Sequence, residues 1–556
     1  MNSTNIRAGT ENELFFGWLD FSIFGCMLGL STLIGIYFGF WGKKEDTPKE
    51  YLHEQYVHCQ FELIHSFLSG VTSLGVPTEI YVYGTLYMWI CVTSILLGIG
   101  NYYIFLPVFY ELQLTSTYEV LSGINVHYIT PIIAIICIFY TMLGIAPIEI
   151  DRQLCQVYGP KIMSKQVGGI KAVVWTDFLQ GFLMVGSSVV VACLGLIHVG
   201  GFGEVWRRNE EGGRIRMSLS PFERMTFWNV CVSYAFHWGG QTMVSQGLVQ
   251  KFLSLPTYRN AKISLVIFVV GLVFINLVTC FIGMLMFAAY HDCDPLKTKG
   301  IPRTDQILPY YVMDIAGSIP GLPGLFIAGI FSASLSTMSS SLNSVGATLF
   351  EDFVRPCLKH KISDKAINNI IKFVVVIIGA ICVINVFVVD RLGTIVQVTG
   401  SAVGVTNGAI LGIFSFGMLY PRGNAKGALA GGICSMLTIG WIVFGTQTAR
   451  LDGRIKDPEL PTSVEGCGLN ATVETPELVD TEDDVFILYK LSFMYYTMTG
   501  CFITMIVGAI VSQLTEPPTI QNSNPKLFSP FIRKYVNRRK KEEAAELDLL
   551  GATTPD

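Results

Sequence analysis

A run of hydroxyl-bearing side chains lies inside a long apolar segment of this chain. Seven of the ten residues from Ser332 to Ser341 are serine or threonine. On a helix, Ala333, Ser336 and Thr337 share one face, so two hydroxyls and a carbonyl one turn earlier can act as oxygen ligands. Uncharged oxygen ligands suit a monovalent hard cation that must be released again. The alternative is structural, because small residues at four-residue steps also let two membrane helices pack closely.

A second candidate is an apolar segment, Ile64–Pro77, that is interrupted by Gly70, Gly75 and Pro77. A helix that is discontinuous at membrane depth exposes carbonyls and half-helix ends, which secondary transporters use to hold an ion and a substrate. The alternative is an ordinary kinked helix whose glycines allow close packing.

A third candidate is a single carboxylate, Asp177, in the apolar stretch Ala172–Gln180. A carboxylate inside a membrane span is costly, so it is a functional hypothesis by default. Its place about two turns from one end of the span leaves a second interpretation open, a capped or water-exposed carboxylate.

Composition indicates the environment in which these residues lie. The 556 residues are 51% hydrophobic and only 14% charged, whereas soluble domains carry about 25% charged residues. We therefore expect an all-α polytopic membrane protein. A net charge of −4 gives no basic face for a nucleic-acid partner.

Twelve segments are long and apolar enough to cross a bilayer, which takes about 20 residues per helix. They are 19–41, 61–85, 88–110, 128–148, 172–199, 227–249, 263–290, 321–350, 370–389, 395–419, 425–445 and 491–511. We therefore predict an N-terminal segment 1–18, a membrane domain 19–512 and a polar tail 513–556.

The remaining charges predict the orientation, because short cytoplasmic loops are enriched in lysine and arginine. The basic cluster Arg538–Lys541 places the tail in the cytoplasm, and the long loop Thr446–Lys490 then lies outside with an N-glycosylation acceptor at Asn470. Twelve spans would leave Lys43, Lys44 and Lys49 outside, against the rule. Thirteen spans would restore agreement.

Enzyme signatures are missing from the sequence. His53, Glu54 and His58 are spaced one residue too far for a helical zinc motif, and neither a nucleotide-binding loop nor a serine-hydrolase elbow occurs. We expect no catalytic residue, no cofactor and no metal other than a coupling ion, which favours transport driven by a gradient over an ATP-driven pump.

Four stretches together resemble the sodium:solute symporter family, in the branch that holds monocarboxylate, multivitamin and iodide transporters. They are Ser69–Tyr81, Leu106–Glu119, Gly169–Gln180 and Gly321–Pro356. The resemblance implies thirteen helices, an outside N-terminus and a LeuT-like core of two inverted five-helix repeats. The second repeat would be about 227–419, and the first about 61–199.

The first repeat contains four recognisable spans where the resemblance implies five. The missing helix should follow Tyr118–Leu121, and Ile145–Gly168 is an apparent insertion relative to the family pattern. A mis-spliced transcript or a divergent, inactive family member would explain both departures.

The resemblance also implies a sodium site. Its ligands would be the backbone carbonyls of His65, Leu68 and Ala333 and the hydroxyls of Ser336 and Thr337. A histidine at position 65 departs from the small residue usual in the family, although only its carbonyl is needed.

By the same resemblance, Asp177 lies near the sodium exit, Thr72 faces the substrate cavity, and Gln246 lies on the broken helix of the second repeat. Cys293 and Cys467 both fall outside in a thirteen-helix topology and could pair.

The sequence therefore predicts a plasma-membrane symporter in which Na⁺ drives a small organic anion, a monocarboxylate or a vitamin such as biotin or pantothenate, by alternating access. Its partners would be the anion, Na⁺ and membrane lipid, with no nucleic acid. The alternative is a non-transporting membrane protein, either a sensor or a product that lacks one core helix.

Overall fold

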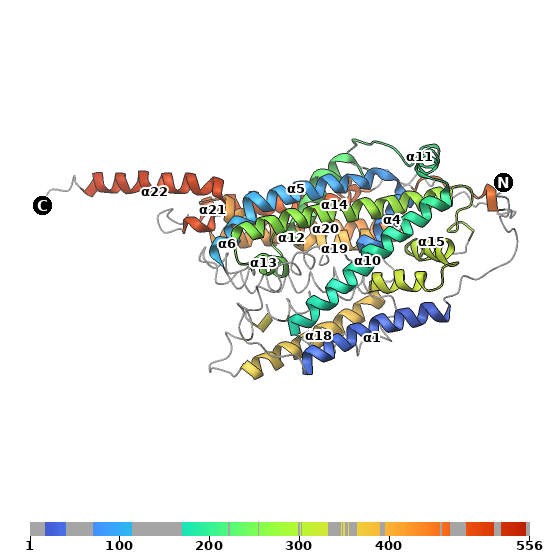
Figure 1. Ribbon diagram of the computed structural model, residues 1–556. Helices are drawn as coiled ribbons and strands as arrows, with labels where there is room; N and C mark the ends of the chain where they lie inside the picture. The colour runs from blue at the N-terminus through green and yellow to red at the C-terminus, as the bar shows by residue number, and fades with distance from the viewer. Residues whose placement is uncertain are drawn as a thin grey trace.

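The computed structural model describes residues 17–40, 71–113, 169–220, 223–253, 255–298, 301, 303–331, 346, 349–350, 354, 364–389, 395–455, 457, 459–467, 485–515 and 524–551. Every regular element in these ranges is helical. Figure 1 shows long helices running side by side in one bundle, with the C-terminal helix α22 (Pro530–Gly551) projecting from one end.

Within the described ranges, six helical segments are long and apolar enough to cross a membrane. They are Thr85–Leu112, Gly181–Val199, Tyr258–Ala289, Gly400–Leu419, Ala425–Leu451 and Phe493–Leu514. They belong to α5 (Ile90–Gly100) with its flanking turns, α10 (Gly169–Val199), α14 (Tyr258–Ala289), α19 (Ile395–Leu419), α20 (Ala425–Leu451) and α21 (Tyr496–Leu514).

Two further predicted spans have helical counterparts, α1 (Trp18–Phe40) and α18 (Asp364–Val389). The span predicted at 128–148, the expected position of the missing helix and the apparent insertion all lie outside the described residues. One predicted boundary is wrong: the loop expected from Thr446 begins later, because α20 continues to Leu451.

Local chemistry explains where two of the long helices begin. The Thr257 side chain accepts a hydrogen bond from the Asn260 N–H at the start of α14, and Asn424 does the same for the Gly427 N–H at the start of α20. These side chains satisfy backbone donors that have no partner in the first helical turn.

A π-helical turn is rare in helices and recurs at functional positions, and three complete turns of this kind lie in the described part of the chain. Val71–Gly75 precedes α4 (Val76–Tyr83), Asn101–Phe105 separates α5 from α6 (Leu106–Leu112), and Asn229–Ser233 precedes α12 (Tyr234–Thr242). Pro77 and Pro107 lie near the start of α4 and α6, and because proline has no backbone N–H, it removes a helical hydrogen bond at each place.

The helices α19, α20 and α21 pack closely against one another. Glycine permits this approach, because a Cβ atom on Gly408 would lie 2.9 Å from the Gly500 Cα and from the Thr497 carbonyl oxygen. In lipid, apolar surface gives little drive for helix association, so close packing through small residues supplies much of it.

The substitution Gly408→Val should destabilise this three-helix contact. The added methyl groups would overlap backbone of α21, and overpacking of this kind costs about 1–3 kcal/mol. We expect a lower melting temperature in detergent, measured by the elution of intact protein after heating. Gly186→Val is the matched control, since nothing lies within 4 Å of its added Cβ. Equal melting temperatures for the two variants would contradict this packing argument.

Candidate functional site

A small cavity lies among four elements near the middle of the bundle. Its lining comes from the π-helical turn Val71–Gly75 and from α5, α12 and α14. The lining residues are Thr72, Ile90, Thr93, Ser94, Leu97, Trp238, Leu272, Ile275 and Asn276. The walls are mostly apolar, a few hydroxyls and one amide provide polarity, and none of these residues carries a charge.

The polar groups of α5 and α14 in this cavity are held in place by hydrogen bonds. The Thr93 hydroxyl donates to the Val230 carbonyl at 2.6 Å, and the Ser94 hydroxyl donates to the Ile90 carbonyl at 2.9 Å. The Asn276 amide donates to the Ser94 oxygen at 3.4 Å. Fixed polar groups in an apolar wall orient a small ligand without demanding a charge.

One wall of the cavity belongs to an interrupted helix. The helix α12 ends at Thr242, and α13 (Gln246–Leu253) begins after a three-residue break. From α19, the Asn407 amide donates to the His237 carbonyl at 2.8 Å. Gly240 makes this approach possible, because a Cβ there would lie 2.6 Å from Asn407 side-chain atoms.

The bundle end at which α4 ends carries a buried cluster of charges, here called the charge cluster: Glu79, Arg224, Arg450 and Asp457. Arg224 Nη2 lies 2.7 Å from Glu79 Oε1, and Arg224 Nη1 lies 2.5 Å from Asp457 Oδ2. Arg450 Nη1 also contacts Asp457 Oδ2 at 2.7 Å. The side chains of Glu79 and Arg224 are only 2% and 5% exposed.

Two further contacts stabilise the Arg224 cation. Its Nη1 also donates to Gln397 Oε1 at 3.0 Å, and its guanidinium carbon lies 4.1 Å from the centroid of the Tyr83 ring. Burying a cation is strongly unfavourable unless it is paired, and Glu79 and Asp457 supply that pairing for Arg224. Glu79 Oε2 and Arg224 Nε nevertheless lack a hydrogen-bond partner within the described part of the chain.

Asp457 lies in the loop that follows α20, and its titration reflects the two arginines. Burial raises the pKa of this carboxyl, but the charge of Arg224 and the hydrogen bonds and charge of Arg450 outweigh burial and hold the pKa below its usual value. Because the folded pKa is lowered, the stabilisation by Asp457 is present at neutral pH and is lost only as the pH falls through that pKa.

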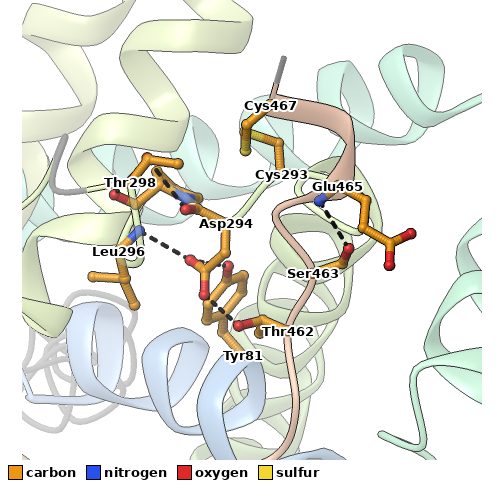
Figure 2. Close-up of a disulfide and its surroundings, with 10 residues drawn as sticks. Tyr81, Cys293, Asp294, Leu296, Thr298, Thr462, Ser463, Glu465 and Cys467 are labelled. Carbon is orange, nitrogen blue, oxygen red and sulfur yellow. Dashed lines mark hydrogen bonds between the residues drawn. A yellow bond between two sulfur atoms is a disulfide. The ribbon is translucent and has the colours of Figure 1, made fainter. Parts of the chain in front are cut away.

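The same loop, of which the structure describes residues 452–455, 457 and 459–467, is here called the strap because it crosses the end of α4. A disulfide joins Cys467 of the strap to Cys293, which follows α14, and this confirms the predicted pairing. Figure 2 shows the disulfide beside Asp294, whose carboxylate accepts hydrogen bonds from Tyr81 of α4 and Thr462 of the strap. We call this end of the bundle the disulfide end.

A second arginine fixes the strap to α4. Arg214 is fully buried, and it donates to the Val82 carbonyl and the Pro461 carbonyl, both at 3.1 Å. The Leu460 N–H also donates to the Val82 carbonyl. Residues 460–467 of the strap therefore form a fixed cover over the end of α4.

Of the residues that the sequence analysis assigned to the site, the structure describes one side chain. Thr72 lines the cavity. Asp177 lies on α10 and Gln246 begins α13, but their side chains are outside the described part of the structure. Also outside it are His65, Leu68, Ala333, Ser336, Thr337 and Asn470.

The sequence analysis missed the charge cluster. Glu79 is a lone carboxylate in the apolar segment Val76–Tyr83, so the rule that singled out Asp177 applies equally to it. Its partner Arg224 lies 145 positions away, and no local spacing links the two.

Comparison with known proteins decides the family. The sequence profile of the sodium:solute symporter family matches residues 58–435, more than half of the chain. The chain belongs to the sodium:solute symporter family. With several helices of spanning length, this family member is a multi-pass membrane protein.

Named relatives cover nearly the whole chain. Sodium-coupled monocarboxylate transporter 2 of Mus musculus is 33% identical, with 95% of this chain and 88% of that protein aligned. Sodium-coupled monocarboxylate transporter 1 of Homo sapiens is 32% identical over 95% and 92%. A putative sodium-dependent multivitamin transporter of Drosophila melanogaster is 33% identical over 94% and 93%.

A solved structure supports the symporter fold. The substrate-bound, outward-open structure of a Na⁺-coupled sialic acid symporter matches with a TM-score of 0.65 at 22% identity, covering 91% of this chain and 100% of that one. The similarity shows that this chain shares the fold of that symporter.

Removal of the disulfide should loosen the strap in this symporter-family protein. The disulfide closes a very long loop, and a disulfide typically contributes about 2–4 kcal/mol to the free energy of unfolding. The substitution Cys467→Ser removes this cross-link. We expect a lower melting temperature in detergent for Cys293→Ser, for Cys467→Ser and, to the same extent, for the double variant. Cys434→Ser, at an exposed free cysteine, is the control. Additive effects of the two single substitutions would contradict the pairing.

Proposed function

We propose that this chain is a plasma-membrane symporter that couples the inward flow of Na⁺ to uptake of a small organic anion by alternating access. The observation that carries the proposal is the uncharged cavity at Thr72, which lies against the interrupted helix α12–α13 in a sodium:solute symporter fold. Relatives named as monocarboxylate and multivitamin transporters support an organic anion, a monocarboxylate or a vitamin such as biotin or pantothenate.

In this proposal Na⁺ binds the carbonyls of His65, Leu68 and Ala333 and the hydroxyls of Ser336 and Thr337. The ligands come from two separate segments, so the bound ion ties them together and favours one conformation of the core.

The anion then enters the cavity beside Thr72, with Gln246 on the adjoining broken helix, and Na⁺ leaves past Asp177. The membrane potential adds about 2.3 kcal/mol per charge per 100 mV to the sodium gradient.

Features at the two ends of the bundle support the proposed orientation. Disulfides persist in oxidising compartments, so the disulfide end faces the outside of the cell. At the opposite end, Arg533 of α22 pairs with Glu111 of α6, and the lysines and arginines of α22 match the cytoplasmic side of a membrane protein. The N-terminus then lies outside, and the C-terminus lies in the cytoplasm.

The double substitution Ser336→Ala with Thr337→Ala should abolish sodium-dependent uptake, because it removes both side-chain ligands of the proposed ion. The assay is uptake of radiolabelled monocarboxylates, biotin, pantothenate and iodide with Na⁺ or choline outside. Thr448→Ala is the control, since that hydroxyl is exposed and bonds only within α20. Unchanged sodium dependence in the double variant would contradict the site. Absence of all flux in surface-expressed wild type would support the non-transporting alternative.

Glycosylation tests the orientation independently of transport. Asn470 follows the disulfide cysteine Cys467 by three positions, so the proposed topology presents it to the glycosylation machinery. Protein expressed in animal cells should shift in gel mobility after amidase removal of N-glycans, and Asn470→Gln in an Asn2→Gln background, which removes the second acceptor Asn2-Ser3-Thr4, should lack the shift. A wild-type protein without the shift, together with a C-terminal epitope that antibodies reach on intact cells, would contradict this orientation.

A further inference from the structure

Three helical segments lead from the cavity toward the charge cluster. Seven positions separate Glu79 from Thr72, which corresponds to about 10 Å at the helical rise of 1.5 Å per residue. Tyr87 and Tyr234 form an edge-to-face pair with ring centroids 6.1 Å apart. On α12, Tyr234 lies one turn before Trp238, which lines the cavity. The tyrosine pair and the charge cluster, which is at the disulfide end, therefore both lie on the disulfide side of the cavity.

The charge cluster is neutral and divides into two neutral pairs. Asp457 contacts both Arg224 and Arg450, and Arg450 reaches it with two nitrogens, Nη1 at 2.7 Å and Nη2 at 3.2 Å. Arg224 in turn keeps Glu79 as a partner. If the contact between Arg224 and Asp457 breaks, no buried charge is left without its counter-charge, which is the arrangement that keeps the cost of separation low.

Arg224 has two other hydrogen-bond partners on the side of the cluster that holds Asp457 and Arg450, and neither partner carries a charge. Gln397 of α19 accepts from its guanidinium, and the Ser492 hydroxyl donates to its backbone carbonyl.

We propose that the contact between Arg224 and Asp457 is the gate of the pathway at the disulfide end. It opens by dividing the charge cluster into the pairs Glu79–Arg224 and Arg450–Asp457. The inference rests on the proposed alternating-access function. Asp457 is the partner that separates from Arg224, and Arg450 is the residue that receives it.

The division predicts opposite effects for two substitutions on the same side of the gate. Asp457→Asn weakens the contact with Arg224, so the pathway at the disulfide end opens more readily. Arg450→Gln leaves Asp457 dependent on Arg224 alone, so the pathway stays closed. If Asp457 and Arg450 contributed only to structural stability, the two substitutions would change the opening of the pathway in the same direction.

The first test measures the external Na⁺ concentration that half-activates uptake, corrected for surface expression. We expect a decrease of about three- to fivefold in Asp457→Asn and an increase of similar size in Arg450→Gln, the range for an ion pair whose carboxylate, 15% exposed here, keeps some access to water. The controls are Asp452→Asn and Arg454→Gln, which alter an exposed pair on the same strap. Shifts in the same direction for both gate variants, or shifts no larger than those of the controls, would overturn the gate.

The second test does not require transport. A cysteine introduced by Tyr234→Cys lies beneath the charge cluster, and its reaction with a membrane-impermeant thiol reagent applied outside reports opening. We expect faster labelling with Asp457→Asn and slower labelling with Arg450→Gln, after subtraction of labelling at native cysteines. If wild type shows no sodium-dependent uptake, the proposed function fails, and equal labelling rates in both variants would separately overturn the gate.

Discussion

The burial of the Arg224 cation is the constraint on which the disulfide end of the structure depends. A guanidinium that is nearly inaccessible to water is stable only with carboxylates beside it, and these come from α4 and from the strap. Glu79 fixes α4 at the disulfide end, and Asp457 fixes the strap across it. The disulfide and the fully buried Arg214 then hold the rest of the strap. Three elements distant in sequence are thereby closed over one cavity.

The rest of the bundle is held together differently. Its outer surface is apolar, and its helices contact one another through small residues. Close approach of α19 to α21 at Gly408 and Gly500 provides packing that large side chains would prevent. Polar groups of α5 in the bundle interior are bonded to backbone carbonyls, Ser94 to Ile90 of its own helix and Thr93 to Val230 in a distant segment. An uncharged cavity in such surroundings can release a small ligand, because no strong ionic contact has to be broken in its walls.

Sequence alone predicted the long helices well because the bilayer fixes their length and composition. The predicted spans 263–290 and 395–419 agree with α14 and α19 to within a few residues. The pairing of Cys293 with Cys467 was predictable because charge patterning placed both on one side. The contact between Glu79 and Arg224 was not, because it depends on how the bundle closes and no periodic pattern records it. The same holds for the path of the strap, which is set by carbonyls of Val82 and Pro461 that any residue could supply.

The neutrality of the two pairs within the charge cluster has a consequence for the energetics of transport. A gate that separates Glu79–Arg224 from Arg450–Asp457 moves no net charge through the membrane field, since each pair carries equal and opposite charges. The membrane potential therefore does little work on the gate and acts on the charges that cross, at about 2.3 kcal/mol per charge per 100 mV. In the proposed mechanism the voltage dependence of uptake therefore comes from Na⁺ and the substrate anion, and opening at the disulfide end depends on the balance of ion pairs.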